Sequence, residues 1–267
     1  MSISRKTSVV LLLLAVALIA LNGVAFAQSD AVVKIGVMGP FTGPAASIGQ
    51  EQLNWAKLAV ADFNEATGWN VELVEGDTQL DPAIAVTVAE SLISDADIYG
   101  VVGPAGSQEV EATQPMFQEA SLVQISGSAT RPSLTTTGFD TFFRTVPTDA
   151  AQGPTVADFI ANELGVTSLY VIDDQTSYSV GLADEASAAF EAAGGTIAGR
   201  ESVTQDDVDF SSLVTLINST DAGAIFFPGQ IASQGALIAK QMQEQGSTAV
   251  LFGADGRPLA AAGERDR

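Results

Sequence analysis

Two hydroxyl side chains stand where the sequence predicts helices to begin. Ser107 follows the turn 103–106 after an apolar run, and Thr130 follows the apolar run 121–126. The first backbone N–H groups of a helix have no partner within the helix, so they attract anions, and a hydroxyl adds another donor. Ser107 and Thr130 together therefore predict a site for a small carboxylate. The alternative interpretation is that both residues only cap their helices, as Ser and Thr commonly do.

Two further side chains could act on the same ligand. Asp255 follows the apolar run 249–253 and could bind an ammonium group. Alternatively, it forms an Asx-turn with Gly256. Tyr178 stands near the start of a predicted helix, where it could supply an aromatic wall or a hydroxyl, or else be a partly buried helix residue. A carboxylate site facing an aspartate would suit an amino acid.

The residue types that are missing exclude several kinds of site. The chain has no histidine and no cysteine, which excludes a Ser-His-Asp triad, a thiolate nucleophile, a disulfide, and His or Cys metal ligands. The phosphate-binding patterns G-x-x-x-x-G-K-[ST] and G-x-G-x-x-G are also absent. With 32 acidic and 11 basic residues, the net charge of −21 repels nucleic acid and anionic membranes. We therefore expect no cofactor, no metal and no nucleic-acid partner.

Alternating strand-like and helical segments must position the candidate residues. Strand-like apolar runs in the first half occur at 32–38, 70–75, 98–103 and 121–126. Between them, Leu53, Ala56, Val60 and Phe63 recur at helical spacing, and Asp81-Pro82 is a typical helix start. Repeated β-α units predict a parallel sheet with helices on both faces, which binds ligands beyond the carboxyl ends of its strands.

The same pattern restarts near residue 147. Strand-like runs follow at 168–173, 196–203, 224–228 and 249–253, with helices expected near 152–164, 180–193, 210–219 and 231–245. We therefore predict an α/β fold of two doubly wound parallel-sheet lobes. We place lobe 1 at residues 28–147 and lobe 2, which is incomplete, at 148–254. The arginine-rich tail 255–267 lacks the β-α pattern, so we expect a truncated or frame-shifted end there.

The first 27 residues have the features of a secretory signal peptide. Arg5 and Lys6 precede the apolar run 9–21, and Ala25-Phe26-Ala27 fits the A-x-A cleavage pattern. The apolar run is shorter than the ~20 residues that a membrane-spanning helix needs, although an uncleaved anchor is the alternative. We expect cleavage after Ala27 and a periplasmic or extracellular protein.

Seven stretches together carry a family resemblance. They read KIGVMGPFTGPAASIGQ, GDTQLDPAIAVTVAESLI, VVGPAGSQEVEATQP, ISGSATRPSL, FFRTVPTDAAQGP, DFSSLVTLI and LFGADG. In this order they resemble the extracellular substrate-binding proteins of branched-chain amino acid ABC transporters, which have the type I periplasmic-binding fold. The resemblance implies a monomer without enzymatic activity. It also implies capture of a branched-chain or similar small aliphatic amino acid between two hinged lobes, for delivery to the membrane permease of an ABC importer.

The resemblance also implies roles for individual residues. Ser107 and Thr130 match the residues that hold the carboxylate of the ligand, and Asp255 matches the acidic residue that binds its amine. Ser128 matches a position whose backbone carbonyl accepts a hydrogen bond from the amine. Tyr178 matches an aromatic residue that closes over the ligand.

The chain departs from the family pattern at several points, and two other functions stay open. Ile48 and Gln230 stand where aromatic residues often line the side-chain pocket, and the disulfide of some members cannot form here. One other function is the ligand-sensing ectodomain of a receptor with the same fold. The other is an enzyme that uses carboxylates such as Asp77 and Asp255 as acid and base. No nucleophile–base pair in the sequence supports the enzyme.

Overall fold

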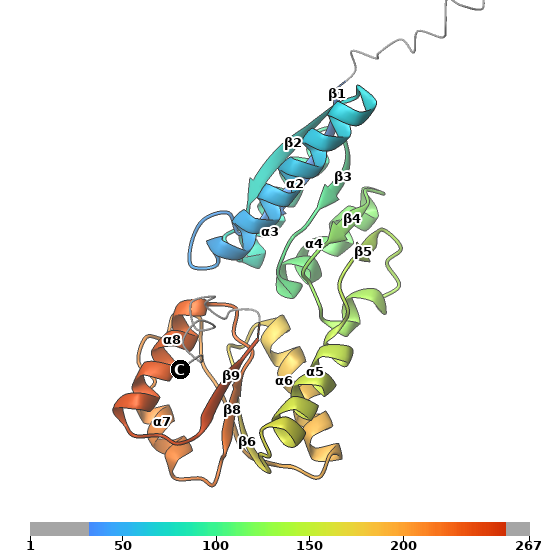
Figure 1. Cartoon of the computed structure of the whole chain (residues 1–267). Coiled ribbons are helices and arrows are strands. Elements are labelled where there is room, and N and C mark those ends of the chain that lie inside the picture. The colour runs from blue at the N-terminus through green and yellow to red at the C-terminus, as the bar shows by residue number, and fades with distance from the viewer. Residues whose placement is uncertain (1–31, 255–267) are drawn as a thin grey trace, which may run out of the picture.

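The computed structural model describes residues 32–254, which form two α/β lobes, one above the other in Figure 1. The predicted signal peptide and the tail from residue 255, with Asp255, lie outside the described residues. The N-terminal lobe contains β1 (Val32–Gly39), α2 (Ala46–Thr67), β2 (Asn70–Asp77), α3 (Pro82–Ser94), β3 (Ile98–Val102), α4 (Ser107–Glu119), β4 (Gln124–Ser126), η1 (Pro132–Thr135) and β5 (Phe142–Arg144). The C-terminal lobe contains α5 (Asp149–Asp158), η2 (Phe159–Glu163), β6 (Ser168–Asp173), α6 (Ser177–Ala192), β7 (Thr196–Ser202), α7 (Ser211–Asn218), β8 (Ala224–Phe227), α8 (Ala232–Glu244) and β9 (Val250–Gly253).

Both lobes are built on parallel sheets. The strand order is β2-β1-β3-β4-β5 in the N-terminal lobe and β7-β6-β8-β9 in the C-terminal lobe. Every pair of neighbouring strands runs parallel. The carboxyl ends of the strands therefore meet at one edge of each sheet, where ligands of such folds bind. The predicted α/β fold class is confirmed.

The C-terminal sheet is covered on both faces. Strand β6 is buried along its whole length, as expected of a central parallel strand. Leu169 and Val171 join the core formed with α5 and α6, whereas Tyr170 and Ile172 join the core formed with α7 and α8. This alternation of side chains is what a strand between two helical layers requires.

The N-terminal sheet is covered less evenly. Helices α3 and α4 pack on one face, where Ile98 and Phe117 belong to the same core. Helix α2 packs on the opposite face through Leu53, near Val37. Exposed apolar side chains remain along β3–β5, and Tyr99 is 68% exposed. Most of the apolar packing of this lobe therefore comes from the face that α3 and α4 cover.

Several predicted local features can be compared with the structure. The helix start at Asp81 is confirmed, because its Oδ1 accepts hydrogen bonds from the N–H groups of Ala83 (2.7 Å) and Ile84 (3.1 Å). The strand predicted at 121–126 is shorter and begins only at Gln124. The helix predicted at 152–164 begins at Asp149 and ends in the π-helical segment η2.

The prediction that a helix opens at Thr130 is wrong. The chain there forms only the short 3-10 segment η1, whose N-cap is Arg131. Three threonines follow Pro132, and β-branched residues disfavour the continuation of a helix. Gly138 then adopts a positive φ of 87°, which redirects the chain toward β5.

The two lobes are joined by few contacts. Within residues 32–254 the chain passes between the sheets once, through 145–148, after β5. A small apolar cluster of Ala45, Leu80 and Ile231 bridges the lobes near the carboxyl ends of the strands. Over the same residues, no helix has both the length and the apolar character needed to cross a membrane.

Candidate functional site

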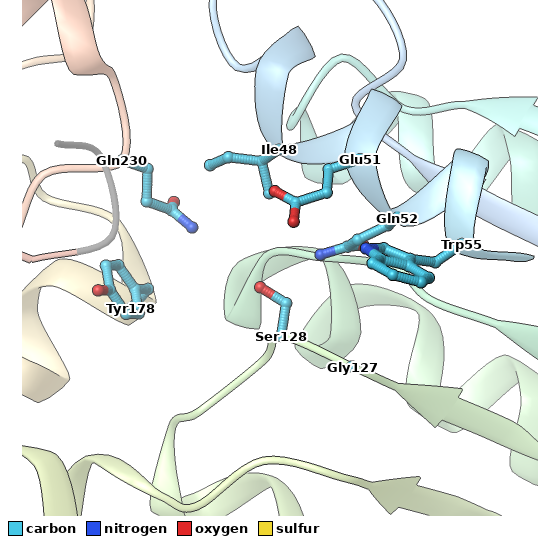
Figure 2. Close-up of a pocket in the computed structure, with 8 residues that line it drawn as sticks. All are labelled: Ile48, Glu51, Gln52, Trp55, Gly127, Ser128, Tyr178 and Gln230. Atoms are coloured by element: carbon cyan, nitrogen blue, oxygen red, sulfur yellow. The ribbon is translucent and has the colours of Figure 1, made fainter. Parts of the chain in front are cut away.

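A pocket of about 380 Å³ lies between the lobes (Figure 2). Its walls come from both lobes: Ile48, Glu51, Gln52 and Trp55 on α2, Gly127 and Ser128 after β4, Tyr178 on α6, and Gln230 after β8. The volume is within the range of small-molecule sites. A second pocket of about 480 Å³ shares Gly127 and Ser128 with the first, and Thr130 is part of its wall.

The first turns of α2 supply one whole wall of the interlobe pocket. Residues 48, 51, 52 and 55 follow the i, i+3, i+4, i+7 spacing that places side chains on one helix face. Sequence reasoning missed Glu51, Gln52 and Trp55, although this spacing directly after the first strand was a usable signal. Trp55 is 64% exposed and gives this wall a large aromatic surface.

Asp77 holds the loop that leads from β1 into α2. Its Oδ1 accepts hydrogen bonds from the N–H groups of Phe41 (2.8 Å), Thr42 (3.2 Å) and Gln79 (3.2 Å), and the Thr42 hydroxyl donates to Oδ2. Burial alone would raise the pKa of Asp77, but these hydrogen bonds, led by those from Thr42, hold it below its ordinary value. A carboxylate bound in this way organises the loop and is poorly suited to proton transfer.

Ser107 and Thr130, the two residues expected to bind a carboxylate, lie close together, but neither caps a helix. The N-cap of α4 is Gly106, and Ser107 is its first helical residue. The Ser107 Oγ accepts a hydrogen bond from the N–H of Arg131 (3.3 Å), which leaves the hydroxyl proton for another acceptor. The Oγ1 of Thr130 is buried and has no hydrogen-bond partner within the described residues. The alternative that both residues are N-caps is therefore wrong.

The candidate residues differ in their access to the pockets. Ser128 and Tyr178 line the interlobe pocket, and Thr130 lines the adjoining one. Ser107 is 1% exposed and lines neither of these two pockets. Asp255 lies outside the described residues. The structure therefore brings four of the five candidates together near the interlobe pocket. Ser128, Thr130 and Tyr178 line a pocket wall, and Ser107 is buried behind the pocket surface.

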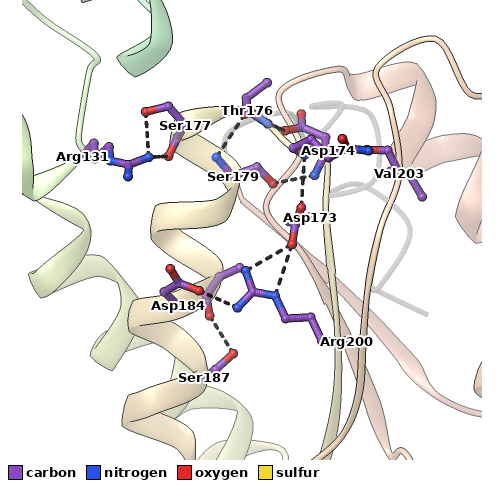
Figure 3. Close-up of polar contacts among 12 residues, drawn as sticks. Arg131, Asp173, Asp174, Thr176, Ser177, Ser179, Asp184, Ser187, Arg200 and Val203 are labelled. Carbon is purple, nitrogen blue, oxygen red and sulfur yellow. Dashed lines mark hydrogen bonds and ion pairs between the residues drawn. The ribbon is translucent and has the colours of Figure 1, made fainter. Parts of the chain in front are cut away.

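Asp174 fixes the two C-terminal segments that face the pocket (Figure 3). Its Oδ1 accepts hydrogen bonds from the N–H (3.1 Å) and the hydroxyl (2.6 Å) of Thr176, the residue that caps α6. Its own N–H donates to the Ser179 Oγ (3.0 Å). Its Oδ2 accepts a hydrogen bond from the N–H of Gln230 (3.2 Å). One buried carboxylate thereby sets the relative positions of Tyr178 and Gln230.

Among the described residues, two side-chain pairs form polar contacts that connect the lobes beside the pocket. Arg131 donates from Nη1 to the carbonyl oxygen (2.8 Å) and the hydroxyl (2.9 Å) of Ser177 (Figure 3). The Nε2 of Gln108 on α4 donates to the Oε1 of Gln230 (2.9 Å). Both contacts involve neighbours of candidate residues, so the distance between the lobes and the shape of the pocket are coupled.

Glu109 is a buried carboxyl group that sequence reasoning missed. It accepts a hydrogen bond from the N–H of Gly106 (2.7 Å) and so closes the turn that carries Ser107. Burial raises the pKa of Glu109 to about 7; the nearby Thr78 hydroxyl and the hydrogen bond from Gly106 oppose the shift, and the charges of Asp81 and Asp77 add to it. A Glu three residues after a glycine was the only sequence signal for this role.

Arg144 at the end of β5 holds the segment that contains Thr130. Its guanidinium donates to the carbonyl oxygens of Ala129 (3.2 Å), Arg131 (2.7 Å) and Pro132 (3.3 Å), and to the hydroxyl of Thr135 (2.6 Å). These bonds converge on a stretch without regular helix, so they replace the hydrogen bonds that a helix would supply.

Replacing Arg144 with methionine should lower the free energy of unfolding by about 1–3 kcal/mol, because several carbonyl groups lose their charged donor. Urea unfolding of the full chain measures the loss. Arg144→Lys keeps the charge but not the forked geometry, and it should recover only part of the stability. An unchanged unfolding midpoint in Arg144→Met would show that this segment does not need the guanidinium.

The fold and the pocket define a two-lobed binding protein of the type I periplasmic-binding class. The profile described as periplasmic binding protein matches residues 32–266, so the chain belongs to that family. Over 227 residues the chain is 35% identical to a Pseudomonas aeruginosa protein named amino acid binding protein, covering 84% of this chain and 60% of that protein. It is 31% identical, with the same coverage, to the leucine-, isoleucine-, valine-, threonine-, and alanine-binding protein of the same organism.

Solved structures give the same result. A leucine binding protein from Thermotoga maritima superposes with a TM-score of 0.78 at 28% identity, covering 84% of this chain and 63% of that one. A branched-chain amino acid transporter substrate binding protein from Streptococcus pneumoniae, in complex with isoleucine, gives a TM-score of 0.77 at 28% identity, covering 85% and 65%. The chain spans about 60% of the length of these two Pseudomonas aeruginosa relatives.

Proposed function

We propose that this protein captures a small amino acid between its two lobes and delivers it to the membrane permease of an ABC importer. The proposal places the protein in the periplasm or outside the cell, as a monomer without enzymatic activity. The names of the relatives favour a branched-chain or similar small aliphatic side chain. We place the lobe boundary between residues 147 and 148, directly after the loop that follows β5.

The observation that carries the proposal is the pocket shared by the lobes beside the Thr130 hydroxyl, which has no partner among the described residues. A buried hydroxyl without a partner is costly unless a ligand supplies one. The Thr130 Oγ1 lacks a partner within the described residues, and the Ser107 Oγ has a proton to donate. Two such donors suit a carboxylate group.

In the proposed mechanism, the ligand first binds the N-terminal lobe through its carboxylate. Thr130 and Ser107 donate hydrogen bonds to it, and the carbonyl of Ser128 accepts one from the amine. Tyr178 then closes over the ligand, and Asp255 binds the ammonium group. Because the ligand contacts both lobes only when they are closed, its binding energy shifts the population toward the closed form. The permease would recognise that form.

A thermal-shift panel of amino acids, their amides and short carboxylates tests capture by the full chain. A true ligand at ~100 times its dissociation constant should stabilise the protein by ~2.7 kcal/mol. Amino acids should do so, whereas their amides, which lack the carboxylate, should not. A panel in which no amino acid shifts the unfolding temperature would contradict the proposal.

Removal of the Thr130 hydroxyl tests the carboxylate site itself. Thr130→Val keeps the shape of the side chain and should raise the dissociation constant about 10- to 100-fold, because a hydrogen bond to a charged group is lost. Thr87, exposed on α3, is the matched control, and Thr87→Val should leave the affinity unchanged. Equal affinity of the Thr130 variant and the parent would remove Thr130 from the site.

A further inference from the structure

Gln230 presents a hydrogen-bond donor to the interlobe pocket that no other described residue uses. The side chain is only 7% exposed, and it lines the pocket from the C-terminal lobe. Its Oε1 is occupied by the Nε2 of Gln108 (2.9 Å), and its backbone N–H by Asp174 (3.2 Å). Its Nε2 has no hydrogen-bond partner within residues 32–254, and Figure 2 shows this nitrogen pointing into the pocket.

The partners of Gln230 fix which end of its amide faces the ligand. Gln108 donates to the oxygen from the N-terminal lobe, so the amide oxygen is already occupied. The amide nitrogen therefore offers its two N–H groups to whatever fills the pocket. A purely aliphatic group there would remove water from these donors without replacing its hydrogen bonds, which is unfavourable.

The opposite wall restricts the charge of the ligand group. Glu51 on α2 directs its carboxylate toward the same space, and Gln52 adds a second amide (Figure 2). A negatively charged side chain would be repelled by Glu51. A cationic group would leave the N–H donors of Gln230 without an acceptor, so the group that fits between Gln230 and Glu51 is neutral and accepts hydrogen bonds.

We infer that Gln230, oriented by Gln108, determines specificity and selects amino acids whose short side chain carries a neutral hydrogen-bond acceptor, a hydroxyl or a carboxamide oxygen. This inference rests on the proposed capture of an amino acid and revises the side-chain preference that the names of the relatives favour, because it ranks such ligands above aliphatic ones of the same size. A site that is built to hydrogen-bond a polar group discriminates strongly against an analogue without it.

Pairs of nearly isosteric ligands test the inference by titration calorimetry on the full chain. Threonine is compared with valine, and asparagine with leucine. The unmodified protein should bind the polar member of each pair at least about tenfold more tightly. Gln230→Met keeps the length of the side chain but removes the donors, so the ratio within each pair should fall to about one or reverse.

Two other variants test whether the effect depends on the oriented amide of Gln230. Gln108→Leu releases the amide of Gln230 and should reduce the ratio without removing the donor. Gln243, exposed on the neighbouring helix α8, is the matched control, and Gln243→Met should keep the ratio of the unmodified protein. Unfolding temperatures measured without ligand establish that each variant is folded.

The possible results distinguish a failure of this inference from a failure of the proposed function. Valine and leucine binding as tightly as threonine and asparagine to the unmodified protein would overturn the inference and leave amino acid capture intact. If folded Gln230→Met keeps the affinity ratio of the unmodified protein, Gln230 does not determine the specificity. Binding of none of the four amino acids, together with an empty thermal-shift panel, would overturn the proposed function and this inference with it.

Discussion

Replacing Gly103 with alanine should lower the free energy of unfolding by about 3–5 kcal/mol. Gly103 follows β3 with a φ of +100°, a conformation that side chains rarely adopt. An added Cβ would also lie 1.9 Å from the carbonyl oxygen of Met38 in the neighbouring strand β1. Because the Met38 oxygen is a backbone atom and the Cβ has no rotational freedom, relief of the contact must separate β1 from the turn that carries Ser107.

Gly138→Ala is the matched control for this prediction. Gly138 also has a positive φ, +87°, but nothing lies within 4 Å of the position of its added Cβ. Gly138→Ala should therefore lower the free energy of unfolding only by the conformational strain, about 1–2 kcal/mol. Urea unfolding of both variants of the full chain measures the difference. Equal losses at the two positions would show that the contact between Gly103 and Met38 does not restrict the chain.

Replacing Glu109 with glutamine should stabilise the protein by about 3 kcal/mol at pH 8, with little effect at pH 4. Burial raises the pKa of Glu109 from 4.5 to about 7 in the folded protein. Between these values the folded state binds a proton that the unfolded state does not. The contribution of Glu109 to stability is therefore fully present below about pH 4.5 and is lost as the pH rises through 7. Glutamine keeps the acceptor for the N–H of Gly106 but never ionises.

Denaturant unfolding between pH 4 and pH 9 measures this effect as the difference between parent and variant. Other carboxyl groups titrate in both proteins, so only the difference reports on Glu109. Glu119, at the exposed end of the same helix, is the matched control, and Glu119→Gln should follow the parent curve at every pH. A constant difference between Glu109→Gln and the parent across the range would contradict ionisation of Glu109 in the folded protein.

The order of the strands and helices was largely predictable from sequence, because buried parallel strands leave long apolar runs. The run 168–173 corresponds to the whole of β6. The short strand β5 was missed, since the three residues Phe142–Arg144 are too few to form a recognisable run. The prediction of a helix after Thr130 was wrong for a different reason. Its Pro-Ser-Leu-Thr start looks helical, but the β-branched residues that follow prevent continuation.

The candidate site was predictable only where it depends on turns at strand ends. Ser128, Thr130 and Tyr178 follow strands or begin helices, so their neighbourhood was expected. The wall formed by α2, the hydrogen bond between Gln108 and Gln230, and the buried Glu109 depend on how distant segments pack. The spacing along α2 and the glutamate after Gly106 left only weak local signals, and the contact between Gln108 and Gln230 left none, because a glutamine or a glutamate at a helix start is usually solvated.

The separate cores of the two lobes affect how any measured unfolding free energy is interpreted. Each sheet has its own hydrophobic clusters, and the apolar cluster that bridges the lobes contains only Ala45, Leu80 and Ile231. With one covalent crossing between them in the described part of the chain, we expect the halves to unfold as two thermodynamic units rather than one cooperative unit. Substitutions at Gly103 and Glu109 would then report on the N-terminal half alone. A ligand held by both halves would fuse the two transitions, so the merging of two calorimetric peaks is itself a signature of capture.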